Sequence, residues 1–318
     1  MKRWASQKSG FTIVELLIVV VVIAILAAIT IVAYNGIQNR AKQSALQENV
    51  KQAATKLSTY AVTASDTYPD PSAFTSSTGL TSDTNVTYTY LPSTDRKDYC
   101  VSATNVQNSA LSYAVTSRSG SPMNGQCVTN YVPNASFEAG ISGWVLNGAA
   151  SSVQSSDWAS LGSNSIRIIP SIATADTFIK IGGQGGMLGL TAGETYTVSA
   201  TSRLSAAQTG TLDNRGRSIV VYSWTGTTSG SLGSSTPMSN SAGSLFQSTT
   251  FTIPSTVTGV EIRLYNGATN SANNSIYWDG VTITKGSSAV QSGDGSSSGW
   301  FWDGTPNAST SIGPALAQ

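Results

Sequence analysis

The side chains best able to do chemistry are a few carboxylates, two cysteines and a set of tyrosines and tryptophans. The chain of 318 residues contains no histidine, which excludes a His-based catalytic triad, a His general base and a His-ligated zinc site. Its 16 acidic residues are scattered, whereas a glycosidase needs two carboxylates about 5–10 Å apart. We therefore predict that the protein is not an enzyme.

Cys100 and Cys127 are the two cysteines and form no C-x-x-C motif, which argues against a metal or redox site. An even cysteine count behind an export-type N-terminus favours one disulfide between them. The alternative is two unpaired thiols.

Tyr222 and Trp224 are two residues apart, as are Arg263 and Tyr265, and each pair lies in a run with strand periodicity. Alternate residues of a strand point to the same face. Sugar rings can stack on such aromatic side chains, and an adjacent Arg can bind their hydroxyl groups. The four residues are candidates for a ligand platform; the alternative is that the aromatics belong to a core.

Net charge is +1 and 10% of the residues are charged, so no nucleic-acid binding is expected. The abundance of Ser, Thr, Gly and Asn suits the short strands and turns of an exported, β-rich protein.

The N-terminal segment is basic and then apolar. Lys2, Arg3 and Lys8 precede an uninterrupted apolar run over 16–29, and 11–34 is long enough to span a bilayer with its N-terminus in the cytoplasm. A cleaved secretory signal and an uncleaved anchor both fit this pattern. Neither needs Glu15, a carboxylate that costs roughly 2.5–3.5 kcal/mol near a bilayer centre.

Ser9 to Leu17, S-G-F-T-I-V-E-L-L, resembles the processing site of type IV prepilins and pseudopilins. The resemblance implies cleavage after Gly10 by prepilin peptidase, N-methylation of Phe11, and a Glu15 that neutralises the Phe11 amine of a neighbouring subunit. The implied partners are the peptidase, other pilin subunits and the assembly machinery. The implied location is first the cytoplasmic membrane, as a single-pass prepilin, and then a surface filament.

Apolar residues at helical spacing continue to Tyr60, so 1–10 is predicted to be a leader and 11–60 one helix. Strand-like runs at 86–91, 99–105 and 111–117 predict a small antiparallel sheet in a head over 61–131. Together these segments predict an α+β pilin module, in which a Cys100–Cys127 bridge would hold the last loop against the sheet, as in many pilins.

The motifs N-A-S-F-E…G-W over 134–144 and S-I-Y-W-D-G-V-T-I over 275–283 resemble the first and last strands of carbohydrate-binding-module-like domains. Six alternating runs lie between them, which predicts an all-β jelly-roll sandwich over 132–286. Glu138 and Asp279, with Asn134 as a weaker candidate, match positions that hold calcium in some members. The alternative is that these side chains cap turns.

The last segment, 287–318, is predicted to be a Ser/Gly-rich linker followed by an aromatic tail. The tail, G-W-F-W-D-G-T-P-N-A-S-T-S over 299–311, resembles endings of some bacterial surface and phage structural proteins. We expect it to dock on the sandwich or on a partner, because three aromatic residues do not remain fully exposed.

These features predict a minor or tip-type subunit of a type IV pilus-like filament that presents the sandwich for adhesion or glycan binding. The alternative is a structural pseudopilin of a type II secretion or DNA-uptake machine, with the sandwich as a spacer.

Overall fold

The computed structural model describes residues 12–148, 150–170, 177–204, 217–235, 243–266 and 275–316. The predicted cleavage position, Gly10 and Phe11, lies outside the described residues. The chain divides into two compact units, Met1–Ala45 and Leu46–Gln318.

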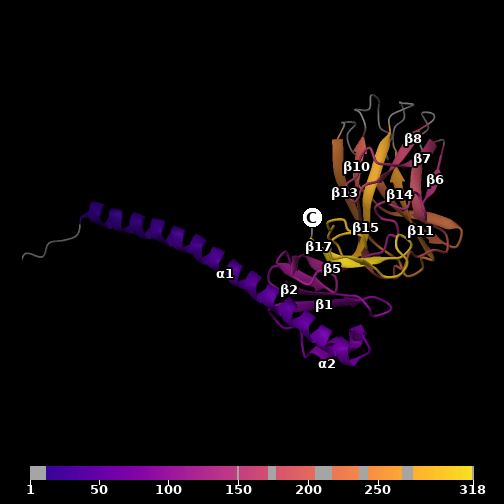
Figure 1. The fold of residues 1–318 in the computed structure, drawn as a ribbon. Coiled ribbons are helices and arrows are strands. Elements are labelled where there is room, and N and C mark those ends of the chain that lie inside the picture. The colour runs from indigo at the N-terminus through magenta and orange to yellow at the C-terminus, as the bar shows by residue number, and fades with distance from the viewer. Residues whose placement is uncertain are drawn as a thin grey trace, which may run out of the picture. The chain divides into compact units, whose positions relative to one another are not determined.

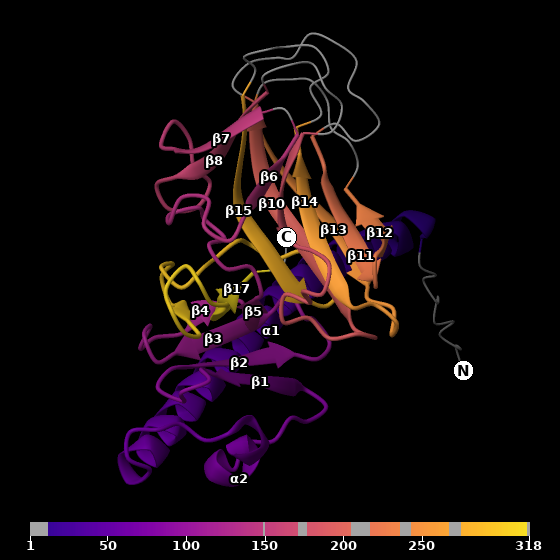
Figure 2. The ribbon, with the colours of Figure 1, turned by 90° about the vertical axis from the view of Figure 1, so that its right-hand side faces the viewer.

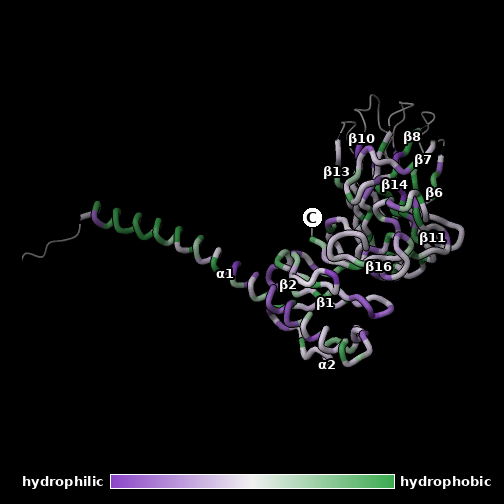
Figure 3. Tube along the Cα trace, in the orientation of Figure 1, coloured by the Kyte–Doolittle hydropathy of each residue, from purple (hydrophilic) through white to green (hydrophobic). Residues whose placement is uncertain are grey.

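Helix α1 spans Ile13–Thr63 (Figure 1) and confirms the long N-terminal helix. Its first part is hydrophobic on all sides (Figure 3), and the side chains there are exposed. Among the described residues it is the one helix long and apolar enough to cross a membrane. A helix that is apolar all round needs lipid or other helices to cover it.

From Leu46 onward, α1 buries one face against a four-stranded antiparallel sheet of order β1-β2-β3-β4. The buried side chains recur at three- and four-residue spacing: Leu46, Val50, Ala53, Leu57 and Ala61. The strands are β1 (Val86–Pro92), β2 (Tyr99–Asn105), β3 (Ser112–Thr116) and β4 (Met123–Asn124). Two short helices, η1 (Pro71–Ala73) and α2 (Phe74–Thr78), connect α1 to this sheet. The predicted α+β head is confirmed.

The predicted disulfide is present: the Sγ atoms of Cys100 and Cys127 are 2.01 Å apart. It joins β2 to β5 (Gln126–Asn130). In the chain-entropy account such a bridge stabilises the fold by roughly 3 kcal/mol.

The sandwich consists of two five-stranded antiparallel sheets, of order β13-β10-β15-β8-β7 and β12-β11-β14-β9-β6. The strands of the first sheet are β7 (Ala150–Ser155), β8 (Ser165–Pro170), β10 (Thr195–Leu204), β13 (Gly243–Thr252) and β15 (Ile276–Lys285). Those of the second are β6 (Val145–Asn147), β9 (Phe178–Gly182), β11 (Ile219–Thr225), β12 (Thr228–Ser234) and β14 (Gly259–Tyr265). Alternate residues of both sheets face inward and form one core. The predicted sandwich is confirmed, with Trp144 and Trp278 in that core.

The C-terminal tail (287–316) does not form the predicted linker. Its Ser292 and Asp294 bond to the sandwich residues Gly280 and Ser136, but its aromatic residues Trp300 and Phe301 do not dock on the sandwich as expected. The tail supplies β16 (Phe301–Trp302) and β17 (Ser311–Ala315), and β17 pairs with β5, opposing Ser311 to Asn130. The linker prediction fails because Val290 and Asp294 are buried. Figure 2 shows β17 and β5 between the head sheet and the sandwich strands. The sandwich is therefore inserted between two paired strands that lie against the head.

Two tryptophans of the tail pack on glycines. The indole of Trp300 packs against Gly293 and Gly313, because a Cβ on either glycine would overlap its ring. Trp302 lies on Gly295 in the same way. Any larger residue at the three glycine positions would displace an indole. The tail motif therefore combines glycines and tryptophans at the spacing that this packing requires.

Asn130 connects β5, the sandwich and the tail. It is fully buried, and its Nδ2 donates to the carbonyl oxygens of Val281 at 3.1 Å and Gly293 at 3.2 Å. Its Oδ1 accepts from the N–H groups of Val132 and Ile283, both at 3.1 Å. All the hydrogen-bonding capacity of this amide is used.

Candidate functional site

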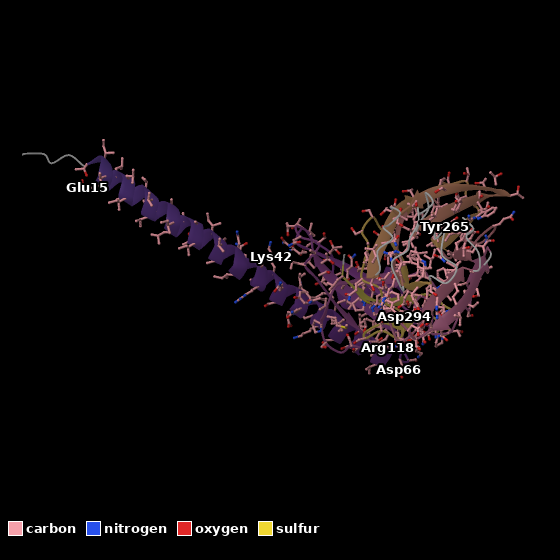
Figure 4. All side chains as sticks on the ribbon, turned by 90° about the horizontal axis from the view of Figure 1, so that it is seen from above. Glu15, Lys42, Asp66, Arg118, Tyr265 and Asp294 are labelled. Atoms are coloured by element: carbon pink, nitrogen blue, oxygen red, sulfur yellow. A yellow bond between two sulfur atoms is a disulfide. The ribbon has the colours of Figure 1, made fainter. Side chains whose placement is uncertain are left out.

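The four predicted platform residues come together on one face of the second sheet. β14 pairs with β11, opposing Tyr222 to Glu261 and Val220 to Arg263. Trp224 and Tyr265 follow two residues further along these strands, so all four side chains share the face that points away from the sandwich core. Figure 4 shows Tyr265 among the sandwich strands.

β9 adds two residues that the sequence analysis missed. It opposes Lys180 to Arg263 and Phe178 to Tyr265. Their same-face alternation was visible in the sequence, but nothing local indicated that β9 neighbours β14.

A buried carboxylate organises the charges on this face. Glu261 is fully buried and forms ion pairs with Lys180, at 3.0 Å, and with Arg263. A buried carboxylate is tolerated because it is paired. Two cations and one anion leave these three side chains with one net positive charge (2 − 1 = 1).

Arg263 is also enclosed by aromatic rings. Its guanidinium carbon lies 3.9 Å from the ring centroid of Tyr222 and 4.6 Å from that of Phe178, distances of strong cation–π contacts. Its Nη1 donates to the Tyr265 hydroxyl at 3.2 Å. Tyr265 is fully buried, so it positions Arg263 and offers no open ring. Tyr222 and Trp224 remain partly exposed.

The second candidate group, Asn134, Glu138 and Asp279, lies at the other sheet and its adjoining loops. The Glu138 carboxylate accepts from the N–H groups of Ser163 and Asn164, both at 2.7 Å. The Asp279 Oδ2 accepts from the N–H groups of Ser160, at 2.6 Å, and Leu161, at 2.7 Å. The two carboxylates thus hold opposite ends of the loop 160–164.

These residues do not fit a calcium site well. The Asn134 Nδ2 donates to the carbonyl oxygens of Gly140 and Ser142, and its Oδ1 accepts from the N–H of Ala139. The amide is therefore already hydrogen-bonded within the protein. The backbone carbonyl of Glu138 accepts a hydrogen bond from Gln154. Among the described residues, no group of three Asp, Glu, Cys or His side chains is placed to hold a metal ion. The geometry favours the alternative, in which the carboxylates cap turns.

Asp279 gives a pH test of this assignment. Its Oδ1 is buried without a hydrogen-bond partner, and burial raises the pKa of Asp279 to about 7, against the lowering effect of the Leu161 and Ser160 N–H groups. A carboxyl whose pKa is higher in the fold stabilises the fold at low pH, and this contribution is lost as pH rises from about 4 to about 7.

We expect the free energy of unfolding of the wild type to fall over this pH range by on the order of 4 kcal/mol more than that of Asp279→Asn. Unfolding of the full chain in detergent measures this difference. Calcium at pH 8 should leave the wild-type unfolding midpoint unchanged. A calcium-dependent rise that Asp279→Asn abolishes would instead show that the ion binds there.

Glu15 lies at the start of α1 (Figure 4). Its Oε2 accepts from the N–H and from the hydroxyl of Thr12, both at 2.8 Å, and the Thr12 hydroxyl accepts from the N–H of Glu15 at 3.2 Å. This reciprocal pattern is a capping box. In this arrangement the carboxylate is bound within its own chain.

Comparison with known proteins assigns two segments of the chain to families. The family model of the prokaryotic N-terminal methylation motif matches residues 5–31, and that of a carbohydrate binding domain matches residues 129–275. The chain joins a prepilin methylation motif to a carbohydrate-binding domain. The prepilin motif implies processing by prepilin peptidase and pilin assembly, and with the apolar helix it is consistent with membrane insertion before assembly. The carbohydrate-binding domain and the motif are both non-catalytic.

Several solved structures match about half of this chain. One is the CBM22-1–GH10 segment of endo-1,4-beta-D-xylanase 10B from Clostridium thermocellum, complexed with xylohexaose: 15% identity, 52% of this chain, 30% of that chain, TM-score 0.37. The chain thus spans less than a third of that structure. The CBM22-2 xylan-binding domain of Xyn10C from Paenibacillus barcinonensis matches with 16% identity and a TM-score of 0.36; the match covers 48% of this chain and 98% of that one. A CBM4 structure matches with 18% identity and a TM-score of 0.35; the match covers 49% of this chain and 99% of that one. No curated protein matches the chain.

Proposed function

We propose that this protein is a minor or tip-type subunit of a type IV pilus-like filament that presents its carbohydrate-binding domain to surface glycans. The observation that carries the proposal is the presence of both matched segments, 5–31 and 129–275, in one chain.

Assembly follows from the charges that cleavage creates. Cleavage after Gly10 leaves a positive amine on Phe11, next to an apolar helix that requires cover. Glu15 of a neighbouring subunit can neutralise that amine, and a buried charge without a partner is heavily penalised. The pair therefore fixes the axial register between helices, at the cost of the Thr12 capping bonds.

The glycan-binding face is the outer face of β9, β14 and β11. Tyr222 and Trp224 supply partly exposed aromatic surface on which a sugar can stack. Lys180 and Arg263, held by Glu261, supply N–H donors for sugar hydroxyl groups. Tight internal pairing limits the freedom that these groups would lose on binding.

The size of the insertion favours a minor subunit. The sandwich and tail follow a head of modest size, and a copy on every subunit would crowd a tightly packed helical filament.

A glycan array tests the binding role, using the full chain in a detergent that carries no sugar headgroup. We expect at least one glycan to bind, and Tyr222→Ala and Trp224→Ala each to weaken binding by about tenfold or more, which corresponds to the loss of one hot-spot contact. Trp158→Ala is the matched control, because Trp158 lies in the loop between β7 and β8, against Tyr277 of the other sheet.

A uniformly negative array with folded protein would contradict the adhesive role. The sandwich would then be a spacer, as in the pseudopilin alternative. Immunogold labelling of intact cells would separately show whether the subunit lies at filament tips, along filaments or only in the envelope.

A further inference from the structure

A cavity of about 470 Å³ lies where the C-terminal tail meets the head. We call it the seam cavity. Its walls are Thr94, Asp95, Asp98 and Arg118 from the head and Trp302 and Asp303 from the tail. Its volume is within the range of small-molecule sites. None of these residues belongs to the matched carbohydrate-binding domain, 129–275.

The two tail indoles differ in a way that bears on this cavity. Trp300 packs against two glycines and is buried, so it acts as an anchor. Trp302 has one face on Gly295, is partly exposed and lines the cavity. An aromatic ring that is backed by a glycine and lines a cavity can serve as a platform for stacking.

Direct bonds hold the two walls together. The Asp303 carboxylate of the tail accepts from the N–H of Thr94 at 2.5 Å and from its hydroxyl at 3.0 Å. These bonds set the position of the neighbouring Trp302 relative to the head turn. The cavity is therefore pre-formed, which reduces the entropic cost of binding.

The polar groups of the cavity keep capacity for a ligand. The hydrogen bonds that Asp95 accepts from the hydroxyl of Ser93, at 2.6 Å, and from the N–H of Lys97, at 3.0 Å, go to Oδ1, so Oδ2 can accept from a ligand. Arg118 pairs with Asp98 through Nε and Nη2, which leaves the donors of Nη1. Three carboxylates and one guanidinium give the lining a net charge of −2 (1 − 3 = −2).

We propose that the seam cavity is a second sugar-binding site, which holds a neutral pyranose stacked on Trp302. Its hydroxyl groups donate to the carboxylates of Asp95 and Asp303 and accept from Arg118. The negative lining disfavours uronic and sialic acids. The site exists only when the tail is docked, so it gives the aromatic tail motif a binding role in addition to its packing role.

The test is an array of neutral oligosaccharides (cello-, xylo-, malto- and manno-hexaose) with polygalacturonate as the anionic probe. It uses the full chain in sugar-free detergent and a background variant, Tyr222→Ala with Trp224→Ala, that disables the sandwich face. We expect one neutral hexaose to be retained by the background variant, to weaken about tenfold or more with Trp302→Ala, and to weaken a few-fold with Asp95→Asn. Polygalacturonate should not bind the background variant.

Trp302→Phe keeps a smaller ring on Gly295 and covers the case in which Trp302→Ala does not fold. It should retain binding at a several-fold lower affinity. Retention of the hexaose at wild-type affinity by Trp302→Ala or Trp302→Phe would overturn the proposal, as would loss of all neutral binding in the background variant alone. Because each face has its own variants, failure of this site is distinguishable from failure of the sandwich face.

Discussion

Phe301→Ala is expected to lower the free energy of local opening at β5 and β17 by about 3–5 kcal/mol, the usual cost of removing a buried phenyl ring. Phe301 is fully buried and belongs to one hydrophobic cluster with both cysteines of the disulfide, Ala114 and Ile312. Its loss leaves a cavity beside the bridge between β2 and β5. Hydrogen exchange on the full chain in detergent measures this effect strand by strand.

The strand-by-strand measurement also tests the insertion. If the tail belongs with the head, protection should fall in β5 and β17 and remain unchanged in β10, at the centre of a sandwich sheet. Val106→Ala is the control, since Val106 is 51% exposed and its loss should change little. Equal loss of protection in β10 and β5 would mean that the tail stabilises the sandwich instead.

Glu15→Gln is expected to reduce filament incorporation by tenfold or more while the protein still accumulates in the membrane. An unpaired buried charge costs about 3–5 kcal/mol, and glutamine leaves the Phe11 amine of the neighbour without its counter-charge. Glutamine can still form the capping box with Thr12. The change therefore separates the charge from the helix cap, and immunoblots of sheared filaments and of membranes measure the result.

Thr12→Val is the reciprocal variant. It removes the hydroxyl that bonds to Glu15 but keeps the carboxylate, so filaments should form nearly as in the wild type. Normal assembly of Glu15→Gln together with failure of Thr12→Val would show that the cap, and not the charge, is what assembly requires.

Local patterns were enough to predict many of the elements of this protein, although β7, β12, β16 and β17 were not among them. Helical spacing gave α1, and alternation gave most sandwich strands and the shared face of Tyr222 with Trp224. The same alternation could not reveal that Lys180 would meet Glu261 and Arg263, because β9 and β14 are far apart in sequence and their pairing depends on sheet order.

The tail was the largest error, and its cause is the same. Ser and Gly residues are typical of linkers. Here, however, Gly293, Gly295 and Gly313 are required because indole rings lie against them and leave no room for a Cβ. The contact between β17 and β5 joins segments separated by the whole sandwich. Sequence also could not decide between calcium ligands and turn caps at Glu138 and Asp279, since a carboxylate accepts from N–H groups as readily as it binds a cation.

The Asn130–Ser311 pairing has a mechanical consequence. A pull on a glycan held by the sandwich reaches the head through both connections of the insertion, and these lie opposite each other in adjacent strands. One of them, β5, is covalently attached to β2 through Cys127, three residues before Asn130. Tension would therefore pass through a sulfur–sulfur bond into the sheet on α1. The hydrogen bonds of β17 would carry only the remainder of the load, so oxidised subunits should hold a ligand under tension after reduced ones have unfolded.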